Sequence, residues 1–237
     1  MGKLRDLRKT VLSALAAEPW PEGLARLEAL PPKTLVGPLY ACLLEPDRLT
    51  GLRAATAFGA TVARLFAEKP EDARQLMRQL MWRLNEESGN VAWGIPEAFG
   101  EILAAEPSLA REFHRVLASY IHERDCATGD NFLELCPLRR GVYWALGRLA
   151  EERPELALIA EGDLVLALSG DDPESRGLAA WALGSLLRLN GEGDRFASAR
   201  AGLAALVDDA SPLDLYDRGR LRRASVGELA RHALRTG

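Results

Sequence analysis

A three-residue pattern that ends in glycine occurs five times along the chain. The triplets are Ala57-Phe58-Gly59, Ala98-Phe99-Gly100, Ala145-Leu146-Gly147, Ala182-Leu183-Gly184 and Ser225-Val226-Gly227, so the glycines are 41, 47, 37 and 43 residues apart. Self-similarity at a period of about 40 residues is typical of chains built from stacked supersecondary units. The pattern therefore predicts a solenoid, in which each unit packs on its neighbours.

Each triplet lies inside an amphipathic segment. Around the first glycine, the apolar positions Ala57, Phe58, Val62 and Leu65 are spaced by three and four residues, which places them on one face of a helix. A glycine inside a helix costs about 1 kcal/mol relative to alanine. Its recurrence predicts that a neighbouring helix passes there too closely for a side chain.

A second helical segment precedes each of these inner helices. These outer segments lie roughly at 71–84, 108–122, 155–168 and 194–208, and the first unit uses Leu27, Leu30, Leu35, Leu39 and Leu43. Three outer segments begin at a proline (Pro70, Pro107 and Pro154), a residue well tolerated at the first helical position. Two helices per repeat is the pattern of HEAT and armadillo arrays. We predict an all-α fold, a right-handed α-solenoid of about five HEAT-like helical hairpins, with residues 1–237 forming one domain.

The composition agrees with closely packed helices. Alanine and leucine dominate, and β-branched residues do not alternate with polar ones, so we expect no β-sheet. Cys42, Cys126 and Cys136 are spaced neither as a disulfide framework nor as a zinc site. Apolar runs are shorter than the roughly 20 residues that span a bilayer. These features predict a cytoplasmic protein with no membrane segment and no zinc site. We expect no cofactor and assign no residue as a metal ligand.

Two segments of the second unit carry a recognisable motif. MWRLNEESG at 81–89 and WGIPEAFGEI at 93–102 resemble the signature of a bacterial HEAT-repeat family of unassigned function. GVYWALGRL at 141–149 is similar to that family as well, and the resemblance covers about residues 70–190. It implies a HEAT fold and says almost nothing about activity.

Two columns of residues should face the concave surface that solenoids use for binding. They stand three positions before and one position after each repeat glycine, and they include Glu97, Glu101, Trp144, Arg148 and Trp181. Aromatic anchors with charges of both signs suit the binding of an extended or helical polypeptide. The alternative is that both tryptophans are buried between helices and that Glu101 pairs with Arg148 across adjacent repeats.

A second candidate surface is the edge that carries the loops inside the hairpins. The loops at 85–95 and 123–137 are unusually long, should lie side by side, and are rich in carboxylates. The candidate residues on this acidic edge are Asn85, Glu86, Glu87, Trp93 and Asn131. The edge could receive a basic segment or a hard cation. Several carboxylates also have a structural interpretation, because Asp172 before Pro173 is a good helix cap and Glu97 lies in a first turn.

The chain has no recognisable catalytic motif. It lacks a phosphate loop, HExxH and GxSxG, and its three histidines are isolated. The formal net charge of −4 argues against nucleic acid as the main partner. We predict a cytosolic bacterial adaptor that binds another protein or peptide and has no evident catalytic activity. The sequence leaves the oligomeric state open.

Two other functions remain as alternatives. The DNA alkylation-repeat glycosylases are similar in size and helical layout, but their catalytic aspartate would fall near Ala92, whereas Arg140 lies about where they have an arginine. A group of arginines could contact phosphate or form the solvated face of a capping repeat; its members are Arg218, Arg220, Arg222, Arg223, Arg231 and Arg235. The second alternative function is that of a small-molecule modifying enzyme that resembles the HEAT-like bilin lyases.

Overall fold

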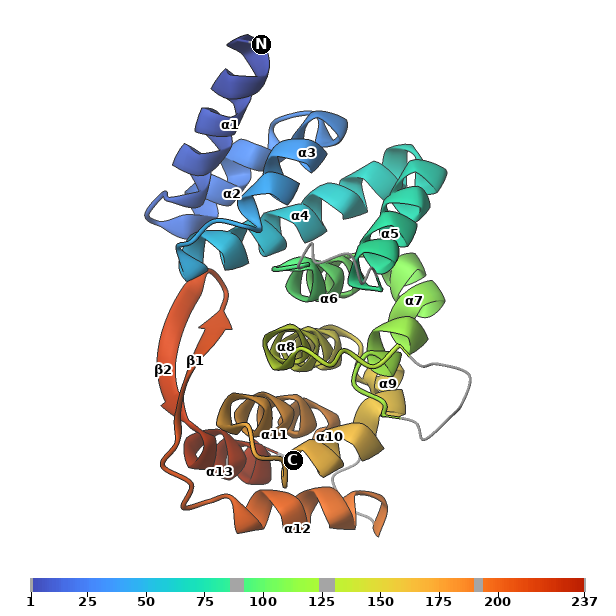
Figure 1. Cartoon of the computed structure of the whole chain (residues 1–237), viewed down its shortest axis with the longest axis vertical. Coiled ribbons are helices and arrows are strands. Elements are labelled where there is room, and N and C mark those ends of the chain that lie inside the picture. Colours follow the sequence, from blue (N-terminus) through green and yellow to red (C-terminus); the bar gives the residue numbers. More distant parts are fainter. Residues whose placement is uncertain (1, 86–91, 124–130, 190–193, 237) are drawn as a thin grey trace. The chain divides into compact units, whose positions relative to one another are not determined.

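The computed structural model of the chain describes residues 2–85, 92–123, 131–189 and 194–236. Most of these residues are helical (Figure 1). They fall into two compact units. Unit 1 contains Met1–Leu109 together with Tyr216–Arg220, and unit 2 contains Ala110–Leu215 together with Leu221–Gly237. That the whole chain forms one domain stays a prediction.

Unit 1 is assembled around one long helix. Its helices are α1 (Gly2–Leu15), α2 (Trp20–Glu28), α3 (Pro32–Cys42), α4 (Arg48–Glu68), α5 (Pro70–Leu84) and α6 (Ile95–Ala105). Helix α4 has 21 residues and packs on α3, α5 and α6. Phe58, Val62 and Leu65 of α4 are buried in these contacts. They are part of the apolar stripe that the sequence predicts.

Unit 2 continues the alternation of outer and inner helices. Its elements are α7 (Pro107–Ser119), whose first turn is counted with unit 1, α8 (Cys136–Glu152), α9 (Pro154–Ala157), the 3-10 turn η1 (Leu158–Ala160), α10 (Glu161–Ala167), α11 (Pro173–Leu187), the 3-10 turn η2 (Asp194–Phe196), α12 (Ala197–Ala205) and α13 (Val226–Thr236). Helix α11 packs between α8 and α13 (Figure 1). The outer helix expected at 155–168 is divided into α9, η1 and α10.

The repeat glycines Gly59 and Gly184 mark close contacts, as expected. A Cβ atom on Gly59 would lie 2.7 Å from the backbone carbonyl carbon and oxygen of Glu101 in α6. On Gly184 it would lie 2.9 Å from the Cβ of Ala233 in α13. Real side chains do not approach other atoms so closely, and packed interiors have little room to shift. The α4–α6 and α11–α13 pairs can therefore pack at this distance because glycine has no side chain.

Two inner helices begin with the same capping arrangement. Asp47 accepts a hydrogen bond from the amide of Thr50 at 2.8 Å, and Asp172 accepts one from the amide of Ser175 at 2.9 Å. Both are N-cap residues, as predicted for Asp172. Asp47 stands 12 residues before Gly59 and Asp172 stands 12 residues before Gly184, so these two inner helices share the position of the cap.

The prediction that the chain contains no β-sheet is wrong. Strands β1 (Pro212–Asp217) and β2 (Arg220–Ser225) form a two-stranded hairpin that separates α12 from α13. The turn residues Arg218 and Gly219 both have positive φ, 44° and 87°, as a tight two-residue hairpin turn requires. A pattern of alternating β-branched and polar residues does not reveal this hairpin, because its strands contain no valine, isoleucine or threonine.

The hairpin also changes the last repeat. Gly227 was expected inside an inner helix, but it lies in the first turn of α13, and a Cβ there would approach the backbone oxygen of Val207 to 2.5 Å. The arginines expected on a capping repeat are all exposed, and Arg218, Arg220, Arg222 and Arg223 are on the hairpin. Arg223 pairs with Asp214 on the opposite strand at 3.0 Å.

Candidate functional site

The inner face of unit 2 carries a pair of tryptophans. Trp144 belongs to α8 and Trp181 to α11, and their ring centroids are 6.4 Å apart with an interplanar angle of 30°. A Cβ atom on Gly147 would collide with the six-membered ring of Trp181. The repeat glycine of α8 therefore provides the space in which the indole of the next inner helix lies.

The two tryptophans differ in their exposure to solvent. Trp144 is 4% exposed and forms part of the packed interior, as in the structural interpretation of the sequence. Trp181 is half-buried. A ligand can therefore reach the indole of Trp181, whereas the indole of Trp144 lies in the packed interior next to it.

Trp181 lines a small hollow between three helices. The hollow has a volume of about 60 Å³ and is bordered by Glu151, Trp181, Gly184, Ser185, Arg188, Leu229, His232, Ala233 and Thr236. Pockets that bind drug-sized molecules usually measure about 300–1,000 Å³. This hollow therefore has room for the end of one side chain and not for a whole small molecule.

Charges of both signs surround this hollow. Arg148, a predicted groove residue, forms ion pairs with Glu151 and, at 3.8 Å, with Glu152. Arg188 donates a hydrogen bond to the Ser185 hydroxyl at 2.8 Å. The half-buried indole thus lies beside groups that can bind either charge or a peptide backbone.

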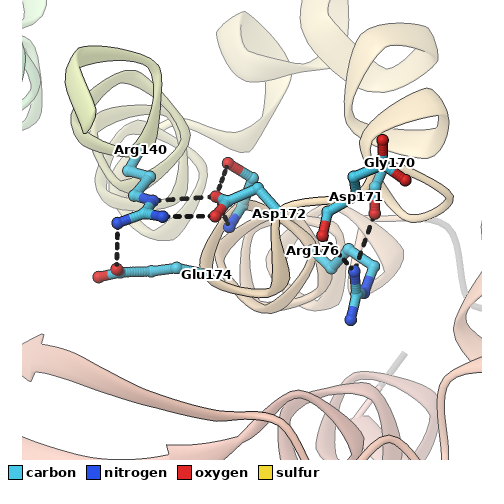
Figure 2. Close-up of polar contacts among 7 residues, drawn as sticks. Arg140, Gly170, Asp171, Asp172, Glu174 and Arg176 are labelled. Atoms are coloured by element: carbon cyan, nitrogen blue, oxygen red, sulfur yellow. Dashed lines mark hydrogen bonds and ion pairs between the residues drawn. The ribbon is translucent and has the colours of Figure 1, made fainter. Parts of the chain in front are cut away.

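An arginine clamp joins α8 to the beginning of α11. The Arg140 guanidinium donates to Asp172, with Nε–Oδ2 at 3.0 Å and Nη2–Oδ1 at 2.5 Å, and its Nη1 lies 3.1 Å from Oε2 of Glu174 (Figure 2). Asp172 also accepts a hydrogen bond from the Ser175 hydroxyl at 2.6 Å. The same carboxylate therefore caps one helix and binds the preceding one.

The clamp shifts the pKa values of both partners. Partial burial favours a higher pKa for the Asp172 carboxyl, but hydrogen bonds from Arg140 and Ser175 outweigh it and hold this pKa well below its usual range. The pKa of Arg140 is raised, chiefly by the hydrogen bond to Asp172. The pair is therefore charged at neutral pH. To bind a DNA phosphate, the Arg140 guanidinium would first have to leave two carboxylates.

A second arginine clamp continues toward the hairpin. Arg176 donates from Nη1 to the backbone oxygens of Gly170 at 2.9 Å and Asp171 at 3.1 Å (Figure 2). Its Nη2 lies 2.8 Å from Oδ2 of Asp209, which in turn accepts from the amide of Ser211 at 2.9 Å. Arg176 therefore fixes the α10–α11 turn and the segment before β1.

The two predicted groove residues of unit 1 are both on α6. Glu97 lies in its first turn, where the helix dipole favours a carboxylate. Glu101 is buried and accepts a hydrogen bond at 3.0 Å from the hydroxyl of Thr56. The Thr56 hydroxyl also lies 3.0 Å from the hydroxyl of Tyr216. Glu101 is thus covered by other parts of unit 1.

The structure describes part of the predicted acidic edge. Asn85 is the C-cap of α5, Trp93 is exposed, and Asn131 donates to the Ser119 hydroxyl at 3.0 Å. Glu86 and Glu87 lie outside the described residues. The acidic edge therefore stays a prediction.

Arg53, a buried arginine of α4, is not among the residues that the sequence pattern indicates. It donates to the backbone oxygens of Gly219 at 2.9 Å and Leu15 at 3.0 Å, and it forms an ion pair with Glu18. Its guanidinium lies 5.1 Å from the ring centroid of Trp20. The available signal was a charged residue in the otherwise apolar run that follows Gly51. Such a residue needs partners when it is buried.

Comparison with known proteins identifies the fold. A family model described as HEAT-like repeat matches residues 137–186, the span from α8 to α11. A designed armadillo repeat protein in complex with the peptide (KR)4 superimposes with a TM-score of 0.55 at 16% identity, covering 95% of this chain and 97% of that one. The chain is a HEAT/armadillo-like α-solenoid. An engineered protein matches this solenoid with a TM-score of 0.57 at 15% identity, over 98% of this chain and 90% of its own. Identities this low show the fold alone.

One curated relative is more similar in sequence. An uncharacterized protein of Archaeoglobus fulgidus is 30% identical in sequence to this chain over 125 residues, which are 53% of this chain and 57% of that protein. The alignment thus spans little more than half of the relative's length.

The described helices are short or polar, and the described acidic and metal-ligating side chains are scattered. None of the helices in this part of the chain combines the length and apolar character needed to cross a membrane. Among the same residues, no three or more histidine, cysteine, aspartate or glutamate side chains are grouped so that they could hold a metal ion.

Proposed function

We propose that this solenoid is an adaptor that binds an extended segment of another protein through the inner face of unit 2. The observation that carries the proposal is the half-buried indole of Trp181, which borders a hollow lined by side chains from three helical repeats. Solenoids commonly bind partners along their inner surfaces. Two fold neighbours support the proposal, because one is in complex with the peptide (KR)4 and another was designed for modular peptide recognition.

The proposed binding mode follows from the size and the charges of the hollow. A volume of about 60 Å³ suits the end of one apolar side chain of the partner, packed against Trp181. Rigid aromatic anchors of this kind often supply most of the binding energy of an interface. Arg188 and Glu151, on the border of the hollow, can pair with charges or backbone groups on either side of that side chain.

The other two functions have weaker support. DNA binding would have to overcome a net charge of −4, and Arg140 is engaged with two carboxylates. The hollow at Trp181 is too small for a whole small molecule, and a larger one of about 410 Å³, bordered by Lys33, Leu65 and Asp72 among others, contains no recognisable catalytic motif. We therefore favour a polypeptide partner.

A cytoplasmic location is part of the proposal. The thiols of Cys42 and Cys136 are free, which fits a reducing compartment. Burial raises the pKa of the Cys42 thiol to about 11, so this thiol stays protonated and unreactive.

Affinity capture from a lysate of the natural host, with Trp181→Ala as the test variant, examines this proposal. The matched control is Trp82→Ala, because Trp82 is a 61% exposed tryptophan on the outer helix α5. We expect one or more proteins to be captured by the wild type and by Trp82→Ala and to be lost with Trp181→Ala. Trp144→Ala is unsuitable, since emptying its buried position costs about 3–5 kcal/mol of stability.

The folding of both variants is checked first by circular dichroism and thermal unfolding. If folded Trp181→Ala retains every protein that the wild type captures, then Trp181 is not the anchor and the proposal fails. If Trp82→Ala loses the same proteins as Trp181→Ala, the capture reports nonspecific adhesion to exposed aromatic side chains, and the proposal also fails.

A further inference from the structure

The tip of the hairpin is counted with unit 1, although its sequence lies more than 100 residues after the rest of that unit. Tyr216–Arg220 share unit 1 with Met1–Leu109. Their contacts include two parts of unit 1: the beginning of α2, at Trp20, and α4, at Arg53 and Thr56. We call the residues that receive the tip, Trp20, Arg53 and Thr56, the turn seat.

The turn seat recognises the backbone of a turn. Arg53 donates from Nε to the carbonyl oxygen of Gly219 at 2.9 Å. Gly219 has a φ of 87°, and a Cβ atom on it would collide with the indole of Trp20. A residue with a side chain would be strained at this positive φ and would also clash with the indole of Trp20. The seat therefore selects a tight turn with glycine at this position.

The turn seat also recognises an aromatic side chain. Tyr216 is buried, and its hydroxyl lies 3.0 Å from the hydroxyl of Thr56, which donates to Glu101. Thr56 stands three residues before the repeat glycine of α4, the position that Trp181 occupies in α11. The hairpin tip thus covers in unit 1 the helical position that borders the hollow in unit 2.

The turn depends on its contacts with the turn seat. Arg218 adopts a φ of 44°, a conformation unfavourable for a residue with a side chain, and this side chain is 92% exposed. The hairpin contains two strands, and an isolated two-stranded hairpin is marginally stable. The contacts of Gly219 and Tyr216 with the seat therefore have to hold a turn that gains little stability from its own conformation.

We propose that Tyr216–Arg220 is an internal ligand, and that the turn seat is a second polypeptide-binding site, specific for a β-turn with tyrosine before it and glycine in it. In this structure the chain's own tip closes the site. A partner that carries such a turn binds by displacing the tip. The inference goes beyond the proposed adaptor function and does not depend on Trp181.

The test uses the full chain with Gly219→Ala, which opposes both the positive φ and the contact with Trp20. Asp217→Ala is the matched control, because Asp217 is exposed on the same tip. Hydrogen exchange of the amides at 216–220 shows whether the tip has left the seat. A fluorescently labelled synthetic peptide of residues 211–226 is then titrated against each protein, and a scrambled peptide serves as the negative control.

We expect amide exchange at the tip to accelerate by about tenfold or more in Gly219→Ala and to stay unchanged in Asp217→Ala. The peptide should bind Gly219→Ala about tenfold or more tightly than the wild type, whose tethered tip competes at an effective concentration near millimolar. A peptide that itself carries Gly219→Ala should not bind. Tyr216→Phe, which removes the hydroxyl that contacts Thr56, should show a smaller change in the same direction.

Three results would overturn the proposal. The first is unchanged exchange at the tip of folded Gly219→Ala. The second is an opened tip without peptide binding, which would make the hairpin a structural element only. The third is equal peptide affinity for the wild type and the variant. If Gly219→Ala does not fold, Tyr216→Phe decides, because an unchanged exchange rate and an unchanged peptide affinity in that variant contradict the proposal. The readouts do not involve capture at Trp181, so the adaptor proposal can fail separately.

Discussion

Asp172 shows how much a single residue contributes to the junction between repeats. It caps α11 through the amide and hydroxyl of Ser175, and it holds Arg140 of the preceding inner helix. The cap was foreseeable, because an aspartate before Pro173 matches a local rule for helix starts. Its ion pair with Arg140 was not, since 32 residues separate the two partners. The lowered pKa of Asp172 makes this junction testable by pH.

Asp172→Asn should separate the ion pair from the cap, because asparagine is also a good N-cap. At pH 7 we expect the free energy of unfolding to fall by about 1 kcal/mol, since a partly exposed pair is screened by solvent. Asp172→Ala should cost about 1 kcal/mol more, because the cap is lost too. Urea unfolding measures both losses, and Asp171→Asn on the adjacent exposed aspartate is the control.

The pH dependence has a definite sign. The pKa of Asp172 is lower in the folded chain than its usual value. Its carboxylate therefore stabilises the fold above about pH 4, and this contribution is lost as the pH falls from there toward the folded pKa. The difference in the free energy of unfolding between the wild type and Asp172→Asn should decrease as the pH falls over that range. A difference that stays constant from pH 6 to pH 2 would show that the ion pair contributes nothing.

At the scale of secondary-structure elements, the repeat glycines decide how closely inner helices pack. Helix propensity alone favours alanine over glycine by about 1 kcal/mol. The structure shows a competing effect at Gly59, where a Cβ would meet the backbone of Glu101. A backbone cannot rotate away as a side chain can, so α4 and α6 would have to separate.

Gly59→Ala should therefore destabilise the protein by about 1–3 kcal/mol, the usual cost of overpacking a filled interior. Gly162→Ala in α10 is the matched control, because a Cβ there meets no atom within 4 Å. It should raise the free energy of unfolding by up to about 1 kcal/mol. Chemical unfolding at one pH compares the two variants. Stabilisation of similar size in both would show that Gly59 is not a packing glycine.

At the scale of the whole molecule, the net charge argues against the DNA-binding function. The formal net charge is −4. The arginines of the hairpin are exposed but few, and Arg223 is already paired with Asp214. Proteins that bind DNA through its backbone neutralise several phosphates, and their affinity falls steeply with salt.

We expect the full chain not to bind a labelled DNA duplex measurably at about 0.15 M salt, where nonspecific DNA-binding proteins have dissociation constants near 10⁻⁴–10⁻⁶ M. Fluorescence anisotropy across a salt series measures this. Arg222→Glu is the control for any weak signal at low salt, since it reverses one exposed charge of the hairpin. Tight binding at about 0.15 M salt with a steep salt slope would favour the DNA-binding function instead.

The sequence by itself determined the features that repeat along the chain. Glycine at a regular interval, apolar residues spaced by three and four, and proline or aspartate at helix starts are local rules, and they predicted the HEAT/armadillo-like solenoid, the inner helices and the cap at Asp172. They also placed Trp144 and Trp181 in equivalent positions of neighbouring inner helices. Each of these features depends on residues close together in sequence or on a repeated spacing.

The tertiary structure decided the features that occur once. Although the two tryptophans occupy equivalent helical positions, Trp144 is buried and Trp181 is half-buried in the folded chain. It placed the carbonyl of Gly219 against Arg53, 166 positions earlier. It also formed a hairpin from strands without β-branched residues. The physical reason is that burial and long-range pairing depend on which surfaces meet after the helices pack, and no local period encodes that meeting.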